Sequence, residues 1–476
     1  MSDAPIIVWF RKDLRLADNP ALWFAGQSGR PVIPLYIYDT ENQHKWHPGA
    51  ASQWWLHHSL KSLATDLHKK NTDLVLRQGD PEKILKDIVK ETGACQIAWN
   101  RQYEPWAVPR DKSIKSTLED MDIEVRTFKG SLLFEPWEIK TKTSGSYYKV
   151  YTPFMKACRE REDTIRPAYD VPSIQTAKSL PKSEKLDDFK LLPDRDWDEE
   201  FYDVWTPGEA GAEKSLKAFI SDHLTDYKDG RNYPAHEDEA VSRMSPHLHW
   251  GEISPYQIWS RVKEERKSEG RKTYLDEIIW REFCYNLLYN VNNFTDQPMH
   301  EKFSGFKWST SENRLERWQK GQTGYPIVDA GMRQLWRTGW MHNRVRMIVG
   351  SFLVKDLLID WRKGEKWFWD CLVDADLANN SGGWQWVAGC GADAQPFFRI
   401  FNPITQSEKF DKKGRYIREY VPELADLPDK HIHAPWDAPE DVLKEAGITL
   451  GKDYPEPIVD HKQAREEALA RYNEIK

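Results

Sequence analysis

Short apolar runs alternate with longer amphipathic stretches over the first 130 residues of this 476-residue chain. The stretches at residues 50–70, 81–92 and 106–120 have the length and the apolar spacing of helices. Such alternation is typical of a parallel sheet with helices on both faces. The sequence therefore predicts an α/β domain with a doubly wound, Rossmann-like sheet over residues 1–130. Its strands are expected at residues 6–10, 32–37, 74–76, 96–99 and 123–125.

The first predicted strand is not followed by the glycine-rich turn that binds a dinucleotide in many such domains. The residues after it are Arg11-Lys12-Asp13-Leu14-Arg15, with no Gly-x-Gly-x-x-Gly. The glycines of that turn let the backbone approach a pyrophosphate closely. The usual dinucleotide fingerprint is therefore absent from this domain.

The rest of the chain divides into a connector and a helical domain. Residues 131–205 mix prolines with charged residues and have few periodic apolar positions, which indicates an interdomain linker. Thr206-Pro207-Gly208-Glu209 then offers an N-cap, a proline at the first helical position and a capping-box glutamate. Apolar residues keep helical spacing beyond it, so residues 206–476 are predicted to form an all-helical domain.

Charge, cysteine content and hydropathy limit the environment of the protein. The net charge is -7, so a nucleic-acid partner would need a local basic patch. Five scattered cysteines without Cys-x-x-Cys spacing fit a reducing compartment and argue against a zinc or iron–sulfur site. No apolar run reaches the length of a membrane span, and residues 1–5 lack a signal-peptide pattern. We therefore expect a cytoplasmic protein without membrane contact.

Signatures of hydrolytic and metal sites are missing from the sequence. There is no His-Glu-x-x-His and no Gly-x-Ser-x-Gly. Residues 374–379 have two aspartates but lack further positions of a calcium loop. His247 and His249 flank Leu248 with no visible partner cluster, so structural histidines are the better interpretation and no metal is expected.

Three stretches combine tryptophan with polar residues in an unusual density: residues 276–283, 339–347 and 374–386. The chain has 23 tryptophans, so their use needs an explanation. Asn343 and Met347 share one helix face because they are four residues apart. Taken alone, the first stretch is explained by a solvated Glu277–Arg281 pair beside a core Trp280.

Together these stretches resemble the photolyase/cryptochrome family, and most of all its bacterial cyclobutane pyrimidine dimer photolyases of the class III type. The resemblance extends over nearly the whole chain, through residues 8–15, 149–154, 242–246, 279–283, 323–330, 340–344 and 398–403. It implies an N-terminal α/β domain, a long linker and a helical domain that holds FAD in a folded conformation. This organisation agrees with the one inferred from periodicity.

The resemblance also implies which residues bind the cofactor. Tyr227 and the stretch from residue 241 to 245 match positions at the flavin diphosphate, where hydroxyl and main-chain N–H groups suit an anion. Asn380 matches the position that faces flavin N5, where an amide, unlike an aspartic acid, cannot donate a proton. The full expected set is Tyr227, Val241, Ser242, Arg243, Met244, Ser245, Tyr274, Trp340, Arg346, Asp374, Ala375, Asp376 and Asn380.

A pocket for damaged DNA is implied next to the cofactor. Glu277, when protonated, and Asn343 would hydrogen-bond the two pyrimidines, and Trp280 and Trp386 would stack on flipped bases. Asn343 and Met347 stand where photolyases of the (6-4) photoproduct have two histidines, which favours the cyclobutane dimer. Arginines would bind phosphates. The full expected set is Arg231, Glu277, Trp280, Asn343, Arg344, Met347, Trp386, Arg399 and Gln406.

Three tryptophans match the chain that carries electrons from the protein surface to oxidised flavin: Trp308, Trp361 and Trp384. With Glu277 and Asn380 they complete the expected catalytic residues. Without the resemblance, each of these tryptophans would be interpreted as an ordinary core residue.

The implied function is light-driven repair of cyclobutane pyrimidine dimers in DNA by electron transfer from excited reduced FAD, performed by a monomeric deoxyribodipyrimidine photo-lyase. The alternative is a cryptochrome-like blue-light photoreceptor, and a second is a flavin oxidoreductase that works in the dark. The sequence leaves the identity of the antenna chromophore undecided: it is 5,10-methenyltetrahydrofolate or a deazaflavin, or the protein has no antenna. Glu104-Pro105-Trp106-Ala107 stands where many relatives have an Asn-Glu pair, whereas residues 48–56 favour the folate.

Overall fold

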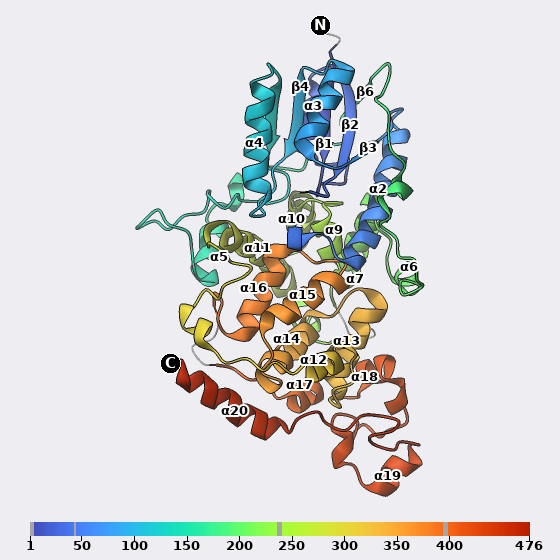
Figure 1. Ribbon diagram of the computed structural model, residues 1–476, viewed down its shortest axis with the longest axis vertical. Coiled ribbons are helices and arrows are strands. Elements are labelled where there is room, and N and C mark those ends of the chain that lie inside the picture. The colour runs from blue at the N-terminus through green and yellow to red at the C-terminus, as the bar shows by residue number, and fades with distance from the viewer. Residues whose placement is uncertain (1–3, 42–43, 236–239, 394–397) are drawn as a thin grey trace.

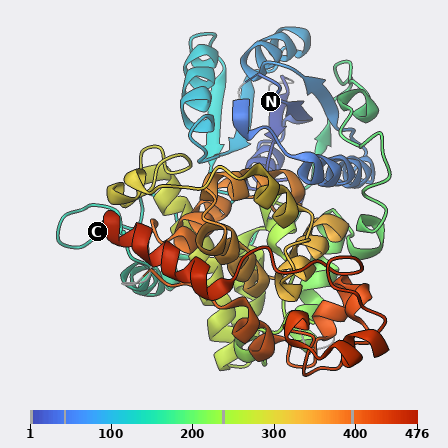
Figure 2. The same ribbon diagram turned by 60° about the horizontal axis from the view of Figure 1, so that its bottom comes forward.

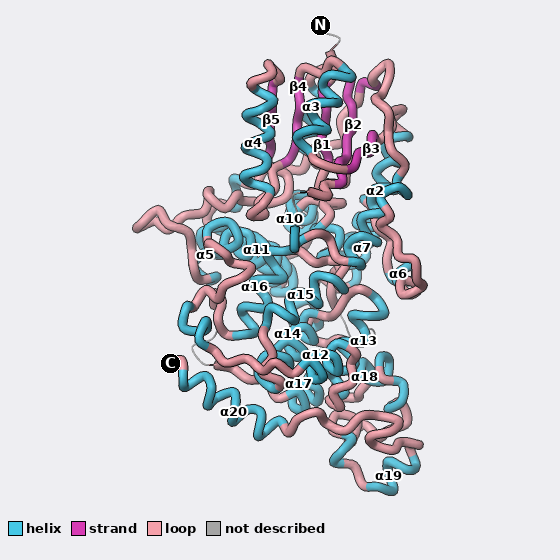
Figure 3. The backbone as a smooth tube through the Cα atoms, viewed as in Figure 1, coloured by secondary structure: helices cyan, strands magenta, loops and turns pink. Residues whose placement is uncertain are grey.

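The computed structural model describes residues 4–41, 44–235, 240–393 and 398–476. Its strands gather at one end of the elongated molecule, and helices form the remainder (Figures 1 and 3). Residues 1–3, on which part of the signal-peptide argument rests, lie outside the described residues. Within the described residues, no helix is long and apolar enough to cross a membrane.

The N-terminal part of the chain forms a parallel sheet, as predicted. The strand order is β3-β2-β1-β4-β5, with every neighbouring pair parallel. The fold class is therefore confirmed: an α/β sheet followed by a helical part. The strands are β1 (Ile6–Phe10), β2 (Pro31–Tyr38), β3 (Val75–Gln78), β4 (Gln96–Asn100) and β5 (Glu124–Phe128).

Helices cover both faces of this sheet because successive strand residues point to opposite sides. Ile6, Val8 and Phe10 of β1 share a core with α1 (Pro20–Gln27) and α2 (Ala50–His68). Ile7 and Trp9 share a second core with α3 (Pro81–Thr92) and α4 (Ala107–Glu119). Continuous apolar runs are expected for strands that are buried on both faces.

Charged side chains gather at the carboxyl ends of β1 and β4, where the strand order reverses. Open α/β sheets commonly bind ligands at such a point. Here Arg11 donates to Asp111 over 2.6 Å, and its guanidinium lies 4.6 Å from the ring centroid of Trp9. Arg110 pairs with both Asp111 and Asp39. An ion-pair network thus stands where the glycine-rich turn is missing.

The predicted linker contains regular elements of its own: α5 (Tyr151–Arg159), β6 (Gln175–Thr176) and α6 (Phe201–Val204). β6 pairs in parallel with the start of β2, and β3 pairs with the end of the same strand. The linker therefore returns to the sheet and adds a sixth strand to it.

The helix start predicted at residues 206–209 was partly wrong. Helix α7 (Glu209–Asp222) begins at Glu209, and Gly208 is the N-cap with a φ of 107° and no side-chain cap. A Cβ at Gly208 would come within 2.1 Å of Ser62 Oγ on α2, so only glycine fits there. The Glu209 carboxylate accepts from the main-chain N–H groups of Leu16 and Ala17 instead of closing a capping box.

Helices build the rest of the molecule around one large apolar core. In Figure 2 the last helix crosses the face of this body. The helices after α7 are α8 (Tyr227–Gly230), α9 (Ser245–His249), α10 (Pro255–Glu264), α11 (Glu269–Asn290), α12 (Glu312–Gln319), α13 (Pro326–Thr338), α14 (Asn343–Ser351), α15 (Trp361–Cys371), α16 (Leu377–Ala388), α17 (Pro403–Phe410), α18 (Arg415–Tyr420), α19 (Glu440–Glu445) and α20 (His461–Glu474).

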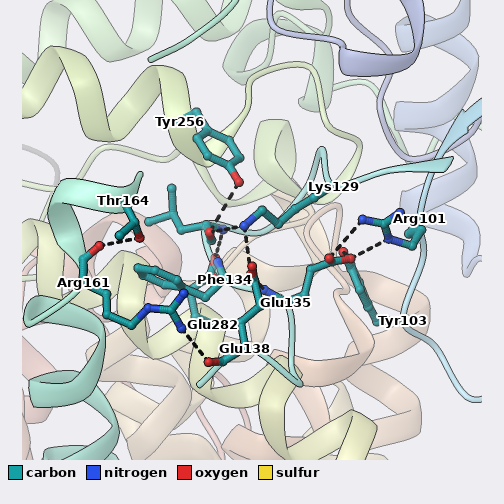
Figure 4. Close-up of polar contacts among 11 residues, drawn as sticks. Arg101, Tyr103, Lys129, Phe134, Glu135, Glu138, Arg161, Thr164, Tyr256 and Glu282 are labelled. Carbon is teal, nitrogen blue, oxygen red and sulfur yellow. Dashed lines mark hydrogen bonds and ion pairs between the residues drawn. The ribbon is translucent and has the colours of Figure 1, made fainter. Parts of the chain in front are cut away.

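A polar cluster joins the sheet, the linker and α11 (Figure 4). Glu135 accepts from two nitrogens of Arg101, at 2.6 and 3.0 Å, and from the Tyr103 hydroxyl at 2.9 Å. Glu282 of α11 accepts from the main-chain N–H groups of Leu133 and Phe134. Burial raises the pKa of Glu282 to about 7. The linker backbone is thus held by a carboxyl group of the helical part.

Candidate functional site

Several of the predicted cofactor residues come together where α8, α11 and the loop before α9 meet. The rings of Tyr227 and Tyr274 lie 5.1 Å apart, edge to face, and both pack on Phe219. The stretch from Val241 to Ser245 runs beside them into α9, and Arg243 lies over the Trp340 ring at 4.9 Å. Tyr227, Tyr274, Met244 and Trp340 are buried, whereas Ser245 is exposed.

Positive charge concentrates around His342, a residue outside the expected cofactor and DNA sets. His342 caps α14 because its Nδ1 accepts from the main-chain N–H of Arg344. Burial, together with the nearby charges of Arg344, Arg243, Arg346 and Arg231, lowers its pKa to about 3. The neutral ring therefore carries its hydrogen on Nε2, which has no partner among the described residues. Such a set of donors suits an anionic group.

Two members of the expected cofactor set, Arg346 and Asp374, form an ion pair in the structure. Arg346 donates to Asp374 Oδ2 over 2.9 Å and to the main-chain oxygen of Met341 over 2.7 Å. Asp374 is buried, and no group in the described part of the chain donates to its Oδ1. A buried acceptor without a partner is costly unless a ligand satisfies it. A flavin, which has N–H and ribityl O–H donors, fits this requirement.

Asp376 occupies the N-terminus of α16, two residues beyond Asp374 and separated from it by the buried Ala375. Its Oδ1 accepts from the main-chain N–H of Asn379, and its Oδ2 accepts from the Tyr285 hydroxyl. Burial opposes its ionisation, but His249 and the charge of Arg281 hold the pKa of Asp376 well below its usual range. This aspartate is thus a helix cap with an ionised carboxylate, and its contact with the cofactor stays a prediction.

Asn380 has a fixed amide on the first turns of α16. Its Nδ2 donates to the main-chain oxygen of Glu365 over 3.0 Å, which leaves Oδ1 as its free acceptor atom. Glu365 accepts from the Ser381 hydroxyl, and burial raises the pKa of Glu365 to about 8. An uncharged carboxyl group therefore contacts Ser381, the neighbour of the residue expected to face flavin N5.

Glu277 is bound by Arg231 and not by Arg281. The Glu277–Arg231 ion pair joins α11 to the end of α8, with side chains 30% and 22% exposed. Arg281 is buried and donates to the main-chain oxygen of Ser131. The interpretation of Glu277 and Arg281 as a solvated pair was wrong, because their common helix turns Arg281 inward. The predicted role of a protonated Glu277 at the dimer requires this pair to separate, and a phosphate at Arg231 would compete with Glu277 for the guanidinium.

Trp280 stacks on Tyr151 of α5. Their ring centroids are 3.5 Å apart and their planes differ by 7°. One face of the indole is therefore covered by a protein ring, and a flipped base can stack only on the other face.

The remaining predicted DNA residues lie on α14, at the end of α16 and beyond it. Asn343 is exposed at the start of α14, where Arg344 contacts the Met347 sulfur at 3.8 Å. Trp386 and the exposed Arg399 line one small pocket with Lys355. Gln406 is half-buried on α17. Roles of these residues in binding stay predictions.

The three tryptophans of the predicted electron chain lie on neighbouring elements. Trp384 of α16 packs so closely on α15 that a Cβ at Gly364 would meet its ring at 2.2 Å. Trp361 is the first residue of α15. A bridge between Ser309 and Ile359 brings the segment of Trp308 beside the start of that helix. Trp384 and Trp361 are buried, and Trp308 is partly exposed.

Several residues of this region could not be identified from sequence patterns. His342, Glu365 and Tyr151 have no distinctive spacing, and their environment depends on contacts between segments far apart in the chain. A signal existed for two of them, because His342 and Tyr151 lie inside motifs that carry the family resemblance.

The two histidines considered as metal ligands each lie near one acidic side chain. His247 pairs with Glu252, and His249 Nδ1 lies 3.9 Å from Asp376. In the described ranges, no three His, Cys, Asp or Glu side chains are placed to hold a metal ion.

Comparison with known proteins decides the family. The chain is 52% identical to a deoxyribodipyrimidine photo-lyase of Agrobacterium fabrum, over 100% of this chain and 99% of the relative. It belongs to the photolyase/cryptochrome family. The family models "DNA photolyase" and "FAD binding domain of DNA photolyase" match residues 6–173 and 274–474.

Other members of the family are also similar to the chain. It is 53% identical to a bacterial class III photolyase of Agrobacterium tumefaciens, with a TM-score of 0.96 over 100% of this chain and 98% of that one. Cryptochrome-1 of Arabidopsis thaliana is 38% identical over 98% of this chain and 69% of its own length. The structure of a Synechocystis cryptochrome is 32% identical in sequence to this chain, with a TM-score of 0.88. The match covers 99% of this chain and 100% of the cryptochrome chain.

Proposed function

We propose that this protein is a deoxyribodipyrimidine photo-lyase that repairs cyclobutane pyrimidine dimers in DNA with light. The observation that carries the proposal is the 52% identity with a photo-lyase of that name over essentially both whole chains. The cryptochromes compared are more distant, at 38% and 32% identity. The rival function as a blue-light photoreceptor is therefore disfavoured.

The protein binds FAD in its helical part. Reduced FAD, when bound and excited, supplies the electron that opens the dimer and regains it afterwards. Arg346 and Asp374 would fix the cofactor through the unsatisfied Asp374 Oδ1, and Arg243, within the stretch from residue 241 to 245, would lie at its diphosphate. The Asn380 amide, held by the Glu365 main chain, presents an acceptor and has no acidic proton to give.

The damaged DNA would bind over α11 and α14. Arg344 and the exposed Arg399 can contact phosphates, which provides the local basic patch that the net charge of -7 conceals. Phosphate competes with Glu277 for Arg231, so DNA binding would free the Glu277 carboxyl group for the dimer.

Repair in light and in darkness tests the proposed activity. The reduced holoenzyme is incubated with thymine-dimer DNA, and remaining dimers are counted after blue light or darkness. We expect loss of dimers in the light alone. No light-dependent loss would contradict repair and favour the photoreceptor, and turnover in darkness would indicate the oxidoreductase.

The cofactor proposal also includes a folate as the antenna chromophore. Residues 48–56, whose sequence favours 5,10-methenyltetrahydrofolate, begin against α15: the main-chain N–H of Ala50 donates to Asp370. The same helix carries Trp367, whose ring lies parallel to that of Trp336 within 7°, with centroids 6.2 Å apart. Trp336 is 54% exposed, so a flat pteridine ring can stack there. We infer that this pair holds the antenna.

Absorption spectra test the antenna site. The holoenzyme is mixed with 5,10-methenyltetrahydrofolate, separated from free ligand and scanned for its near-ultraviolet band. Trp336→Ala should lose the band, whereas Trp137→Ala, which removes another exposed indole, should keep it. Retention of the band in Trp336→Ala would contradict this location. Binding of a deazaflavin and not the folate would contradict the assigned ligand.

The monomeric state and the cytoplasmic location also belong to the proposal. The five cysteines are all free, which suits a reducing compartment. Light scattering during size-exclusion chromatography checks the oligomeric state, since a monomer has a mass of 55.9 kDa.

A further inference from the structure

The stack of Tyr151 on Trp280 connects the linker to the candidate DNA pocket. The two ring planes are nearly parallel, and their centroids are 3.5 Å apart. Phe283 supports both from the side, at 5.8 Å from each ring and roughly perpendicular to each. The three rings thus form one packed unit in which the indole has little freedom to turn.

Tyr151 is itself fixed at two points. Its hydroxyl donates to the main-chain oxygen of Asp276, one helical turn before Trp280, over 2.7 Å. Its main-chain N–H donates to the Asp393 carboxylate in the segment that follows α16. Burial raises the pKa of Tyr151, so the phenol stays a neutral donor.

A second contact keeps the two helices in register. Arg159 at the end of α5 pairs with the Asp276 side chain over 2.7 Å. The position of Tyr151 against α11 is therefore set from both ends of α5.

We propose that Tyr151 is a positioning residue that holds the Trp280 indole in the orientation that stacks on a base of the flipped dimer. The inference rests on the proposed function. Tyr151 covers one face of the indole and leaves the other for the substrate, so it acts through Trp280 and touches no base itself. If the indole is not held in this orientation beforehand, part of the free energy of stacking is lost to ordering the ring.

Equilibrium binding to two DNA duplexes tests the proposal with the FAD-loaded enzyme in darkness. One duplex carries a single thymine dimer, and the other has the same sequence without damage. Tyr151→Ala should weaken binding to the dimer duplex about tenfold and leave the undamaged duplex unchanged. Tyr151→Phe keeps the ring and should restore the selectivity. Tyr151→Leu, which keeps volume but not the flat stack, should behave like Tyr151→Ala.

A double-mutant cycle separates positioning from general structure. If Tyr151 acts through Trp280, Tyr151→Ala should have no further effect in a Trp280→Ala background. Additive losses, unchanged selectivity in both Tyr151→Ala and Tyr151→Leu, or equal losses on both duplexes would overturn the inference. A wild-type enzyme without preference for the dimer would instead contradict the proposed function. Flavin content and melting temperature show that each variant is folded.

Discussion

At the scale of single residues, the site combines groups whose charge is set by burial with groups held by a partner. His342 and Glu365 are both neutral because the protein interior disfavours their charged forms. Arg346 and Asp374 are held as an ion pair, and the family resemblance had implied both residues at the cofactor. The neutral residues could not be predicted, because desolvation depends on every segment that packs around a side chain.

The Glu277–Arg231 pair predicts that the affinity for DNA rises when the negative charge of Glu277 is removed. Glu277→Gln frees Arg231 for phosphate, so binding to undamaged DNA should tighten roughly two- to fivefold at low salt. Fluorescence anisotropy measures the dissociation constant. Asp276→Asn, which changes the neighbouring carboxylate bonded to Arg159, is the matched control. Equal affinities of Glu277→Gln and wild type would mean that Arg231 does not reach DNA.

Glu365 predicts a dependence of stability on pH. Its pKa is about 8 in the folded protein and near 4.5 when unfolded, so the folded state binds the extra proton between these values. This contribution to stability is fully present below about pH 4.5 and is lost as pH rises through about 8. Glu365→Gln should therefore stabilise the protein at pH 9, by up to about 4 kcal/mol, and have little effect near pH 5. Urea unfolding of the holoenzyme measures the difference, and a pH-independent effect would contradict it.

At the scale of elements, periodicity predicted the strands of the sheet and the helices α2, α3 and α4 to within a few residues. It failed at the start of α7, where contact with Ser62 overrides the capping-box pattern. It also missed β6, because two residues carry no pattern of their own and are strand only through β2. The close packing of α15 on α16 was invisible as well, since only the structure shows which glycine lies against Trp384.

The predicted electron chain should affect flavin photoreduction and DNA repair differently. Trp384→Phe should block photoreduction of oxidised flavin and spare repair by enzyme that is already reduced, because only the first reaction draws an electron through Trp384. Absorption spectra under blue light follow photoreduction, and dimer loss follows repair after chemical reduction. Trp318→Phe, which removes a buried neighbour of Trp384, is the control. Equal loss of both reactions in Trp384→Phe would mean that this indole is structural.

Gly364 predicts a packing defect at the same place. A Cβ at this position would lie 2.2 Å from Trp384 Cη2 and 2.6 Å from Leu353 Cδ2. Gly364→Ala should therefore cost about 1–3 kcal/mol of unfolding free energy and slow photoreduction by displacing the indole. Gly383→Ala on α16 meets no atom within 4 Å and is the control. Equal melting temperatures of the two variants would contradict this packing.

At the scale of the whole molecule, the sheet and the helical part are joined by buried polar contacts as well as by the linker. The division into an α/β and a helical part was predictable from the change in periodicity. The hydrogen bonds across it were not, because they join segments far apart in the chain, and some of them involve main-chain groups. Trp55 donates to Glu252, and Glu209 accepts from two main-chain N–H groups near the first strand.

Glu209 predicts how strongly this contact stabilises the molecule. Glu209→Ala leaves the N–H groups of Leu16 and Ala17 without their acceptor and should lower the free energy of unfolding by roughly 1–3 kcal/mol. Glu213→Ala on the same helix removes only an exposed ion pair with Arg261 and should cost less than about 1 kcal/mol. Denaturant unfolding compares the variants, and equal costs would contradict a structural role of Glu209 between the two parts.

The return of β6 to the sheet restricts how the N-terminal part can be separated or recombined. A fragment ending near residue 130 would lack the strand that pairs with Pro31 and Val32. It would present an unpaired edge at the start of β2, and such edges promote aggregation. A cassette for domain exchange would therefore need residues up to at least Thr176, so the boundary suited to recombination lies well inside the segment that resembles a linker.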